Sequence, residues 1–335
     1  MAKKTNSTKT TVSSPISTAI KHNKGEVEYA PKADICLLVS VQNSNPNGDP
    51  DDEGRPRVDM DDHAIMSAVS IKAKIRSLLK AYADPTIGFF GEEADKNKIF
   101  VEKGTIRTQQ IVNNVNLDGH KELKTTLTSK GGKSEEEGEE KSTGKKPVPR
   151  EERAYLAGEL CNQFLDIRLF GQCLNDIGAI EGPIQIENAV SVNKVDVVDM
   201  CITASQVSSE DQYNKKGDRT MGRSSSVRFA LLPIYIHVNG IRAKQNGLTR
   251  ADYERFLEIL PEVFEQTNSS VRNIQFEKMF VFEHENIRGN MPMKDIRKAV
   301  LFEFTKETPT SMDDVKIVVN DPKINSFSGI KFYTK

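Results

Sequence analysis

The chain has 335 residues, of which 37% are hydrophobic and 28% charged, and its formal net charge is −1. No stretch approaches the roughly 20 apolar residues of a membrane-spanning helix, and the N-terminus lacks the apolar core of a secretion signal, so we expect a soluble cytoplasmic protein with no membrane partner. The charge argues against a simple polybasic nucleic-acid binder, but a segregated charge map still allows one basic groove. The four cysteines show no metal-binding spacing, as is typical of reduced thiols.

The chain is predicted to begin with a disordered extension, followed by a strand and an unusual loop. Residues 1–30 are rich in Ser, Thr and Lys without an apolar pattern, whereas the apolar run 33–42 predicts a strand. The loop that follows contains three prolines and two glycines and carries Arg55 and Arg57. Such a loop suits close contact with the backbone of a ligand, and its arginines suit a phosphate.

The same loop is rich in acids, and its start partly matches a calcium-binding loop. Asp49, Asp51, Glu53 and Gly54 stand at the first ligand positions, but Met60 occupies the place of the required bidentate acid. We therefore expect no metal at this loop. The acids are interpreted as turn formers that keep the loop solvated.

A basic amphipathic helix is predicted over 62–83, because apolar residues recur there with helical spacing. It carries Lys72, Lys74, Arg76 and Lys80. Positions 72, 76 and 80 are four residues apart, which predicts one basic stripe opposite the apolar face. Such a stripe is either a solvated surface or a track for phosphates, and its nearness in sequence to the arginines of the loop favours the second interpretation.

The rest of the chain alternates between strand-like, helix-like and polar segments. The predicted elements are a strand at 106–117, a flexible insertion at 119–153, a helix at 154–165, strands at 183–192 and 228–238 with a protruding hairpin or loop at 193–227 between them, helices at 249–265 and 270–282, a strand at 299–304, and a terminal hairpin of 315–319 with 329–333. Strand, helix, excursion, strand, helix and strand follow in the order expected of a ferredoxin-like sheet with large insertions, an α+β fold.

Several short motifs together resemble those of the CRISPR type I effector (Cascade) backbone subunits, most of all subtype I-C. They cover roughly residues 33–305 in the order of that family. The motifs are Asn45-Pro46-Asn47-Gly48-Asp49-Pro50-Asp51 with Arg55-Pro56-Arg57-Val58-Asp59, the helix around Ser70–Leu79, Asp166-Ile167-Arg168-Leu169-Phe170-Gly171, Gly182-Pro183-Ile184-Gln185, Thr220-Met221-Gly222-Arg223 and Phe282-Glu283-His284. One departure is Ala73, where relatives often carry another basic residue.

The resemblance implies a modified ferredoxin-like, RNA-recognition-like palm with an inserted finger domain and a protruding thumb hairpin. It divides the chain, after the extension 1–30, into a first palm half at 31–83, a finger insertion at 84–182 containing the flexible 119–153, a thumb region at 183–228 and a second palm half at 229–335. The expected thumb would cross the guide RNA and displace bases at regular intervals.

The resemblance also implies a non-enzymatic subunit that polymerises along CRISPR RNA and serves target DNA recognition. Its expected partners are the guide RNA, target DNA, neighbouring copies of itself and other subunits of the interference complex, without a cofactor. The expected RNA-binding residues are Asn45, Asn47, Arg55, Arg57, Lys72, Lys74, Arg76, Arg168, Arg219, Met221, Gly222, Arg223 and Arg228. From composition alone, the basic stretch 215–228 equally fits a solvated surface loop.

Two rival functions remain open. One is a type III-like backbone subunit that cuts RNA with a metal and a loop aspartate, for which Asp49, Asp51 and Asp218 are the candidates. The other is an ordinary metabolic enzyme that merely shares the motif. The five histidines show no nucleophile or metal pattern, and none of the common hydrolase motifs occurs, so we expect no catalysis.

Overall fold

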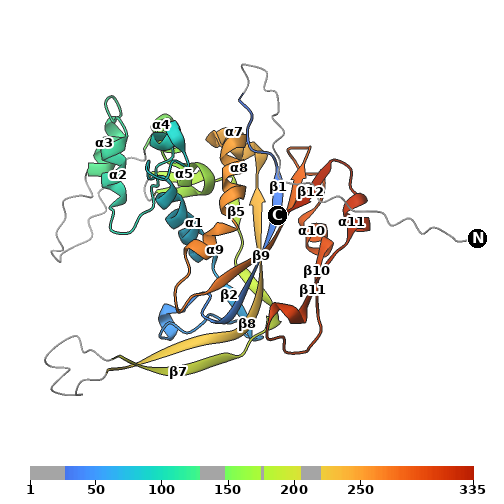
Figure 1. Cartoon of the computed structure of the whole chain (residues 1–335). Helices are drawn as coiled ribbons and strands as arrows, with labels where there is room; N and C mark the ends of the chain where they lie inside the picture. The colour runs from blue at the N-terminus through green and yellow to red at the C-terminus, as the bar shows by residue number, and fades with distance from the viewer. Residues whose placement is uncertain (1–26, 129–147, 175–176, 205–219) are drawn as a thin grey trace, which may run out of the picture.

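The computed structural model describes residues 27–128, 148–174, 177–204 and 220–335. A central antiparallel sheet has the strand order β12-β9-β1-β8-β5, and β7 pairs with an extension of β8 beyond the sheet (Figure 1). The strands of this sheet are β1 (Ala33–Ser44), β5 (Ile184–Ile186), β7 (Val197–Ala204), β8 (Thr220–Val238), β9 (Ile274–His284) and β12 (Ile330–Thr334).

Both faces of the sheet are covered, which is why β1 reads as a continuous apolar run. Ile35 and Leu37 point into a core with α1 (Ala68–Tyr82), α7 (Gly240–Asn246), α8 (Arg250–Ile259) and α9 (Glu262–Gln266). Cys36, between them, points to the opposite face, into a second core with α10 (Met293–Ala299) and α11 (Asp321–Asn325). Alternate residues of a strand face opposite sides, so a strand covered on both needs no polar positions.

The segment between α1 and β5 forms a separate helical layer with its own hydrophobic cluster. Its elements are the 3-10 helix η2 (Gly91–Lys96), the helices α2 (Arg107–Asn114), α3 (Lys121–Thr128), α4 (Arg150–Gln163) and α5 (Leu165–Phe170), and the paired strands β3 (Gly171–Leu174) and β4 (Gly178–Glu181). The strand predicted at 106–117 is wrong, because α2 occupies this stretch. The flexible insertion predicted at 119–153 is wrong at both ends. At its start, Leu123 and Leu127 of α3, four residues apart, are buried, and at its end α4 begins at residue 150. Residues 129–147 lie outside the described residues.

The hairpin predicted within 193–227 is confirmed where the structure describes it. β7 and β8 pair antiparallel from Val197↔Val227 to Ala204↔Thr220. In Figure 1 this hairpin projects away from the central sheet at its lower end. The stretch 205–219 lies outside the described residues.

The helix predicted from 62 begins later, and a strand precedes it. β2 (His63–Met66) pairs with β6 (Ala189–Lys194), so this part of the loop region is tied to the base of the hairpin. Ser67 then caps α1 by accepting a hydrogen bond from the backbone N–H of Ser70. The predicted helix 249–265 is present as α8 and α9, which meet at Pro261 as expected.

The prediction of a helix at 270–282 is wrong, and so is the predicted terminal hairpin. β9 lies between β1 and β12 in the sheet, where both faces are covered, and its apolar run therefore lacks strand alternation. β11 (Val315–Val319) pairs with β10 (Val300–Phe304) instead of with β12. The 3-10 helix η3 (Met312–Asp314) precedes β11.

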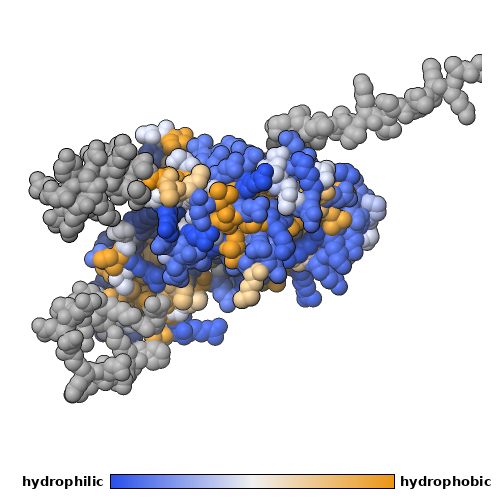
Figure 2. All heavy atoms as spheres, turned by 90° about the horizontal axis from the view of Figure 1, so that it is seen from below, coloured by the Kyte–Doolittle hydropathy of each residue, from blue (hydrophilic) through white to orange (hydrophobic). Residues whose placement is uncertain are grey.

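The end of the predicted disordered extension is ordered. Ala30 is buried and its backbone N–H donates to the carbonyl of Leu248, while Tyr29 bridges to Thr249. Among the described helices, none combines the length and apolar character needed to cross a bilayer. The face seen from below in Figure 2 is mostly hydrophilic, with hydrophobic side chains in small separate groups.

Candidate nucleic-acid interface

The loop after β1 is held rigidly by its two asparagines. Asn45 Nδ2 donates to the carbonyl of Gly54 at 2.8 Å, which closes the loop on itself. Asn47 Oδ1 accepts from both the backbone N–H and the hydroxyl of Ser67, each at 3.0 Å, and so joins the loop to the start of α1. Both asparagines are buried, so the structure assigns them to the scaffold of the loop rather than to its surface.

Gly48 and Gly54 allow the two arms of this loop to approach closely. A Cβ added to Gly48 would stand 2.7 Å from the carbonyl oxygen of Gly54, and Gly54 itself has φ +80°. Between them lies the 3-10 turn η1 (Pro50–Asp52), capped by the side chain of Asp49. The proline- and glycine-rich stretch is therefore a compact turn that presents its arginines outward.

Ion pairs connect this loop to the β7–β8 hairpin. Arg55 Nη2 lies 3.2 Å from Asp199 Oδ2 of β7, and Arg223 Nη1 of β8 lies 3.8 Å from Glu53 Oε2. Arg57 pairs within the loop with Asp49 at 3.1 Å. The two basic clusters that lie far apart in the sequence are thus brought together. All six side chains keep substantial exposure, and surface pairs of this kind are weak.

The cations of α1 do not form the predicted single stripe opposite its apolar face. Its exposed positions are Val69, Ala73, Ser77, Lys80 and Ala81, and Lys80 pairs with Glu102 at 2.8 Å. Successive residues of a helix are 100° apart, which places Lys72 and Arg76 along one edge of the exposed surface and Lys74 along the other. The helix therefore presents a small-residue ridge with positive charge on both sides.

Lys72 and Arg76 lie over the ring of Phe170, each 5.4 Å from its centroid. Arg76 also pairs with the buried carboxylate of Asp166 at 3.0 Å, whereas Lys72 has no carboxylate partner among the described residues. Burial and then the neighbouring charge of Arg76 lower the pKa of Lys72. Lys72 and Arg76 border an open pocket of about 440 Å³, which Gln172 and Arg242 also line.

On the other edge of α1, Lys74 lies beside Arg272 of the loop between α9 and β9. Lys74 Nζ donates to the hydroxyl of Thr267 at 3.3 Å. Burial and then the charge of Arg272 lower the pKa of Lys74. Neither cation has a carboxylate partner within the described part of the chain. Two unneutralised cations held together in this way disfavour each other and favour an anion between them.

Arg168 is not part of this surface, and its prediction as an RNA contact is withdrawn. Its side chain is 9% exposed, and its guanidinium bonds Asp252 through two nitrogens at 3.0 and 3.2 Å. It donates further to the carbonyl of Cys161 and to the side chain of Asn97. Because every nitrogen of the guanidinium is engaged inside the protein, Arg168 fastens α5 to α8.

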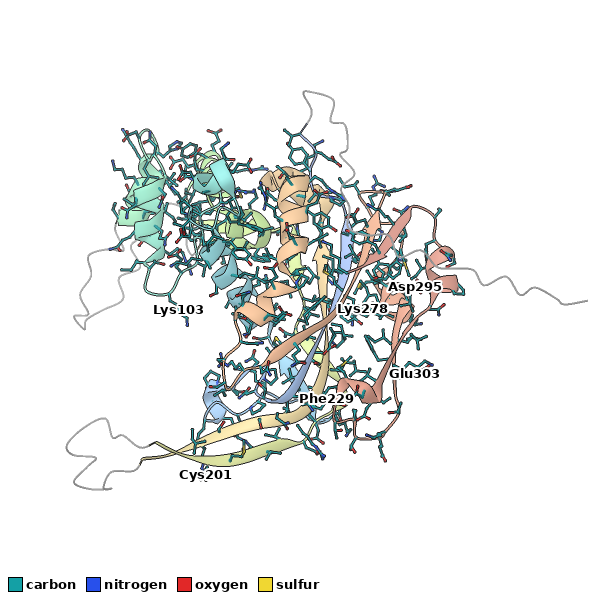
Figure 3. All side chains as sticks on the ribbon, viewed as in Figure 1. Lys103, Cys201, Phe229, Lys278, Asp295 and Glu303 are labelled. Carbon is teal, nitrogen blue, oxygen red and sulfur yellow. The ribbon has the colours of Figure 1, made fainter. Side chains whose placement is uncertain are left out.

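Three of the remaining predicted residues are placed and two are not. Gly222 pairs with Ile202 across the hairpin, and Arg223 and Arg228 are exposed on β8. Arg219 and the side chain of Met221 lie outside what the structure describes, as does Asp218. Figure 3 shows Lys103, between α1 and α2, projecting on the same side of the molecule as Cys201 of the hairpin.

The sequence reasoning missed Arg272 and Arg242. Both stand outside the matched motifs and carry no local pattern, and only the folded chain brings them to α1. The candidate metal ligands do not gather: within the ranges that the structure describes, no three His, Cys, Asp or Glu side chains could hold a metal ion. Asp49 is occupied by Arg57 and by the cap of its own turn.

Comparisons with known proteins find distant similarity to two solved structures. Two solved structures, titled "CRISPR RNA-guided surveillance complex, pre-nicking" and "CRISPR RNA-guided surveillance complex", have similar chains. The first is 15% identical with a TM-score of 0.44, over 79% of this chain and 81% of the other. The second is 14% identical with a TM-score of 0.39, over 76% and 70%. No curated protein matches the chain.

Membership rests on the family match and not on these distant similarities. The model of the family described as CRISPR-associated protein Cas7 matches residues 31–320, which include the loop after β1, α1 and the β7–β8 hairpin. Because this match spans most of its length, the chain belongs to the Cas7 family of CRISPR-associated proteins.

Proposed function

We propose that this chain is the guide-RNA-binding backbone subunit of a type I CRISPR interference complex, of subtype I-C. Several copies polymerise along one CRISPR RNA, whose bases pair with target DNA, and other subunits complete the complex in the cytoplasm. The observation that carries this proposal is the meeting of the loop and the hairpin through the Arg55–Asp199 and Arg223–Glu53 pairs. The same loop is joined to the start of the basic helix α1 through Asn47 and Ser67.

The arrangement of elements supports a division into palm, finger and thumb. The neighbouring strands β9-β1-β8-β5, with α1 between β1 and β5 and with α8 and α9 between β8 and β9, follow the pattern of two interlocked βαβ units in a ferredoxin-like palm. The helical layer between α1 and β5 serves as the finger. The β7–β8 hairpin serves as the thumb.

The cations of this surface can bind a ribose-phosphate backbone in two ways. Lys72, Lys74 and Arg272 have no carboxylate partners among the described residues and would accept phosphates directly. Arg55 and Arg223 would exchange weak surface pairs for phosphates, which also releases counterions from the RNA. These cationic side chains set the path of the RNA backbone, while base pairing between the guide and its target supplies sequence specificity.

The experiment measures RNA affinity against salt by fluorescence anisotropy, for guide RNAs of two unrelated sequences. Lys72→Ala, Lys74→Ala and Arg272→Ala should weaken binding to both sequences alike, and each should reduce the slope of log affinity against log salt by about 0.7. Lys316→Ala removes an exposed cation on β11 that pairs with Glu303, and serves as the matched control. If the salt slope stays unchanged in Lys72→Ala, Lys74→Ala and Arg272→Ala alike, these cations do not contact RNA phosphates.

We further propose that the subunit itself does not cut RNA, in contrast to a type III-like subunit. Purified complex incubated with matched RNA and Mg²⁺ should leave the RNA intact. Cleavage that disappears in Asp49→Ala or Asp51→Ala would establish the alternative. The absorbance spectrum of the purified protein distinguishes the third possibility, a metabolic enzyme. A backbone subunit retains RNA of uniform length, whereas an enzyme gives the spectrum of protein alone.

A further inference from the structure

The two ends of strand β1 carry two different surfaces. β1 pairs with β8 from Ala33↔Val238 to Ser44↔Val227, so the loop that follows Ser44 leaves at the Val227 end. Residues that precede β1 lie at the other end, beside the end of β8. A strand of 12 residues is about 40 Å long, and the two surfaces of one molecule therefore cannot touch.

At the Ser44 end, the turn from Asp59 to Asp62 exposes an apolar side chain in an acidic setting. Met60 is fully exposed at the tip of this turn. Asp59 fixes the turn by accepting from the backbone N–H groups of Asp61 and His63, at 2.9 and 2.8 Å. Asp62 makes a 3.9 Å pair with Lys194, in which both side chains are exposed. A methionine held out by an ordered turn is a typical contact residue for another protein surface.

At the opposite end lies a pocket with a volume of about 780 Å³. Its mixed lining includes the apolar side chains of Ile241, Ile287 and Met293, of which Ile241 and Ile287 are about half exposed. Arg288 and Arg242 also line it. Arg288 has no carboxylate partner among the described residues, and Arg242 pairs with Glu181. The size is that of a pocket for a ligand or an anchoring side chain.

We propose that the Asp59–Asp62 turn of one copy docks in this pocket of the next copy, with Met60 between Ile241 and Ile287. This inference rests on the proposed polymerisation and adds the surfaces that meet. The acids around Met60 then face Arg288 and Arg242. The turn and the pocket therefore match both in their apolar side chains and in their charges. Because the two surfaces differ, the contact is heterologous, and on a linear guide RNA it adds copies in a row.

Cross-linking tests the contact in the complete protein assembled on a guide RNA that holds several copies. Cys173→Ser and Cys201→Ser first remove the exposed thiols. Met60→Cys and Ile287→Cys in one chain, treated with a short bismaleimide, should give a ladder of covalent dimers, trimers and longer species. A mixture of the two single variants should stop at dimers. The control is the double variant Met60→Cys with Leu301→Cys, because Leu301 on β10 is about as exposed as Ile287. It should give no ladder.

A charge exchange provides a second readout that does not depend on the cross-linker. Arg288→Glu should raise the protein concentration for half-maximal assembly on RNA by roughly tenfold, and adding Asp61→Arg to it should restore assembly. RNA-bound assemblies that form without a cross-linked ladder and without any effect of Arg288→Glu would overturn the contact alone. Failure of the parent protein to assemble on RNA at all would instead overturn the proposed function, and the contact with it.

Discussion

The backbones of Gly171 and Gly182 lie in direct contact. A Cβ added to Gly182 would stand 2.0 Å from the carbonyl carbon of Phe170, and one added to Gly171 would stand 2.1 Å from the carbonyl oxygen of Ile180. Gly171 also has φ +69°, which favours glycine. This crossing joins the end of α5 to the entry of β5, and so fixes Phe170 beneath Lys72 and Arg76.

Gly182→Ala should therefore destabilise the protein by about 3 kcal/mol or more, because backbone atoms on both chains would have to move. Urea unfolding followed by circular dichroism measures this change. Gly158→Ala is the matched control: Gly158 lies within α4 with no atom within 4 Å of an added Cβ, and alanine there should stabilise by up to about 1 kcal/mol. Equal effects of the two substitutions would refute the contact.

Removing Arg168 tests its reassignment from the surface to the interior. Arg168→Met leaves the buried carboxylate of Asp252 without its bidentate partner, and the loss should be about 3–5 kcal/mol of unfolding free energy. The exposed Lys316–Glu303 pair is the comparison, since Lys316→Ala should cost at most about 1 kcal/mol. RNA affinity of the folded Arg168→Met protein should match that of the parent, and a reduced salt slope would return Arg168 to the interface.

The sequence was most informative where one physical pattern acted alone. The apolar run of β1, the helical spacing of α1 and the break at Pro261 each have a local cause, and each was predicted. β9 was mistaken for a helix because a strand covered on both faces has no period of two. The pairing of β11 with β10 instead of β12 depends on contacts distant in sequence, which local patterns do not contain.

The candidate site was predictable in its location but not in the role of each side chain. The motifs pointed to the loop, to α1 and to the hairpin, and the fold joins the loop to both of the others. Charge alone, however, did not distinguish Arg168, which pairs with a carboxylate 84 positions away, from an exposed arginine. The same reason explains why Arg272 was missed, since only the fold brings it to Lys74.

His237 lies between two carboxylates. Its Nδ1 is 2.7 Å from Asp34 Oδ1, and its Nε2 is 2.7 Å from Glu187 Oε1. Ionised carboxylates only accept hydrogen bonds, so the ring satisfies both as an imidazolium cation. The hydrogen bond to Asp34 raises the pKa of His237, against the opposing effect of burial. Other groups face the cluster: Lys32 and His284 bond to Asp34, and Arg297 bonds to Glu187.

Stability should consequently fall at mildly alkaline pH. A raised folded-state pKa means that the contribution of His237 is complete below its unfolded pKa of about 6.5 and is lost as pH rises through the folded value. Urea midpoints between about pH 6 and about pH 9 should show this decline in the parent and a flatter profile in His237→Gln. His120→Gln is the control, because the ring of His120 stacks on Tyr155 instead of facing a carboxylate. A profile unchanged by His237→Gln would assign the decline to other groups.

Asn47 links the ordering of the loop to the start of α1. Because asparagine is uncharged, its substitution disturbs the placement of the arginines of the loop without removing a positive charge. Asn47→Ala removes the acceptor for the N–H and hydroxyl of Ser67, the residue that caps α1. We expect a loss of about 1–2 kcal/mol of unfolding free energy. RNA affinity should fall as well, because Arg55 and Arg57 are no longer held in place, while the salt slope stays at the parent value since no charge is removed. Asn116→Ala, at an exposed asparagine whose side chain accepts from the nearby N–H of Asp118 and whose backbone bond to Tyr155 the substitution keeps, should change neither quantity. A reduced salt slope for Asn47→Ala would show instead that this loop unfolds and releases its phosphate contacts altogether.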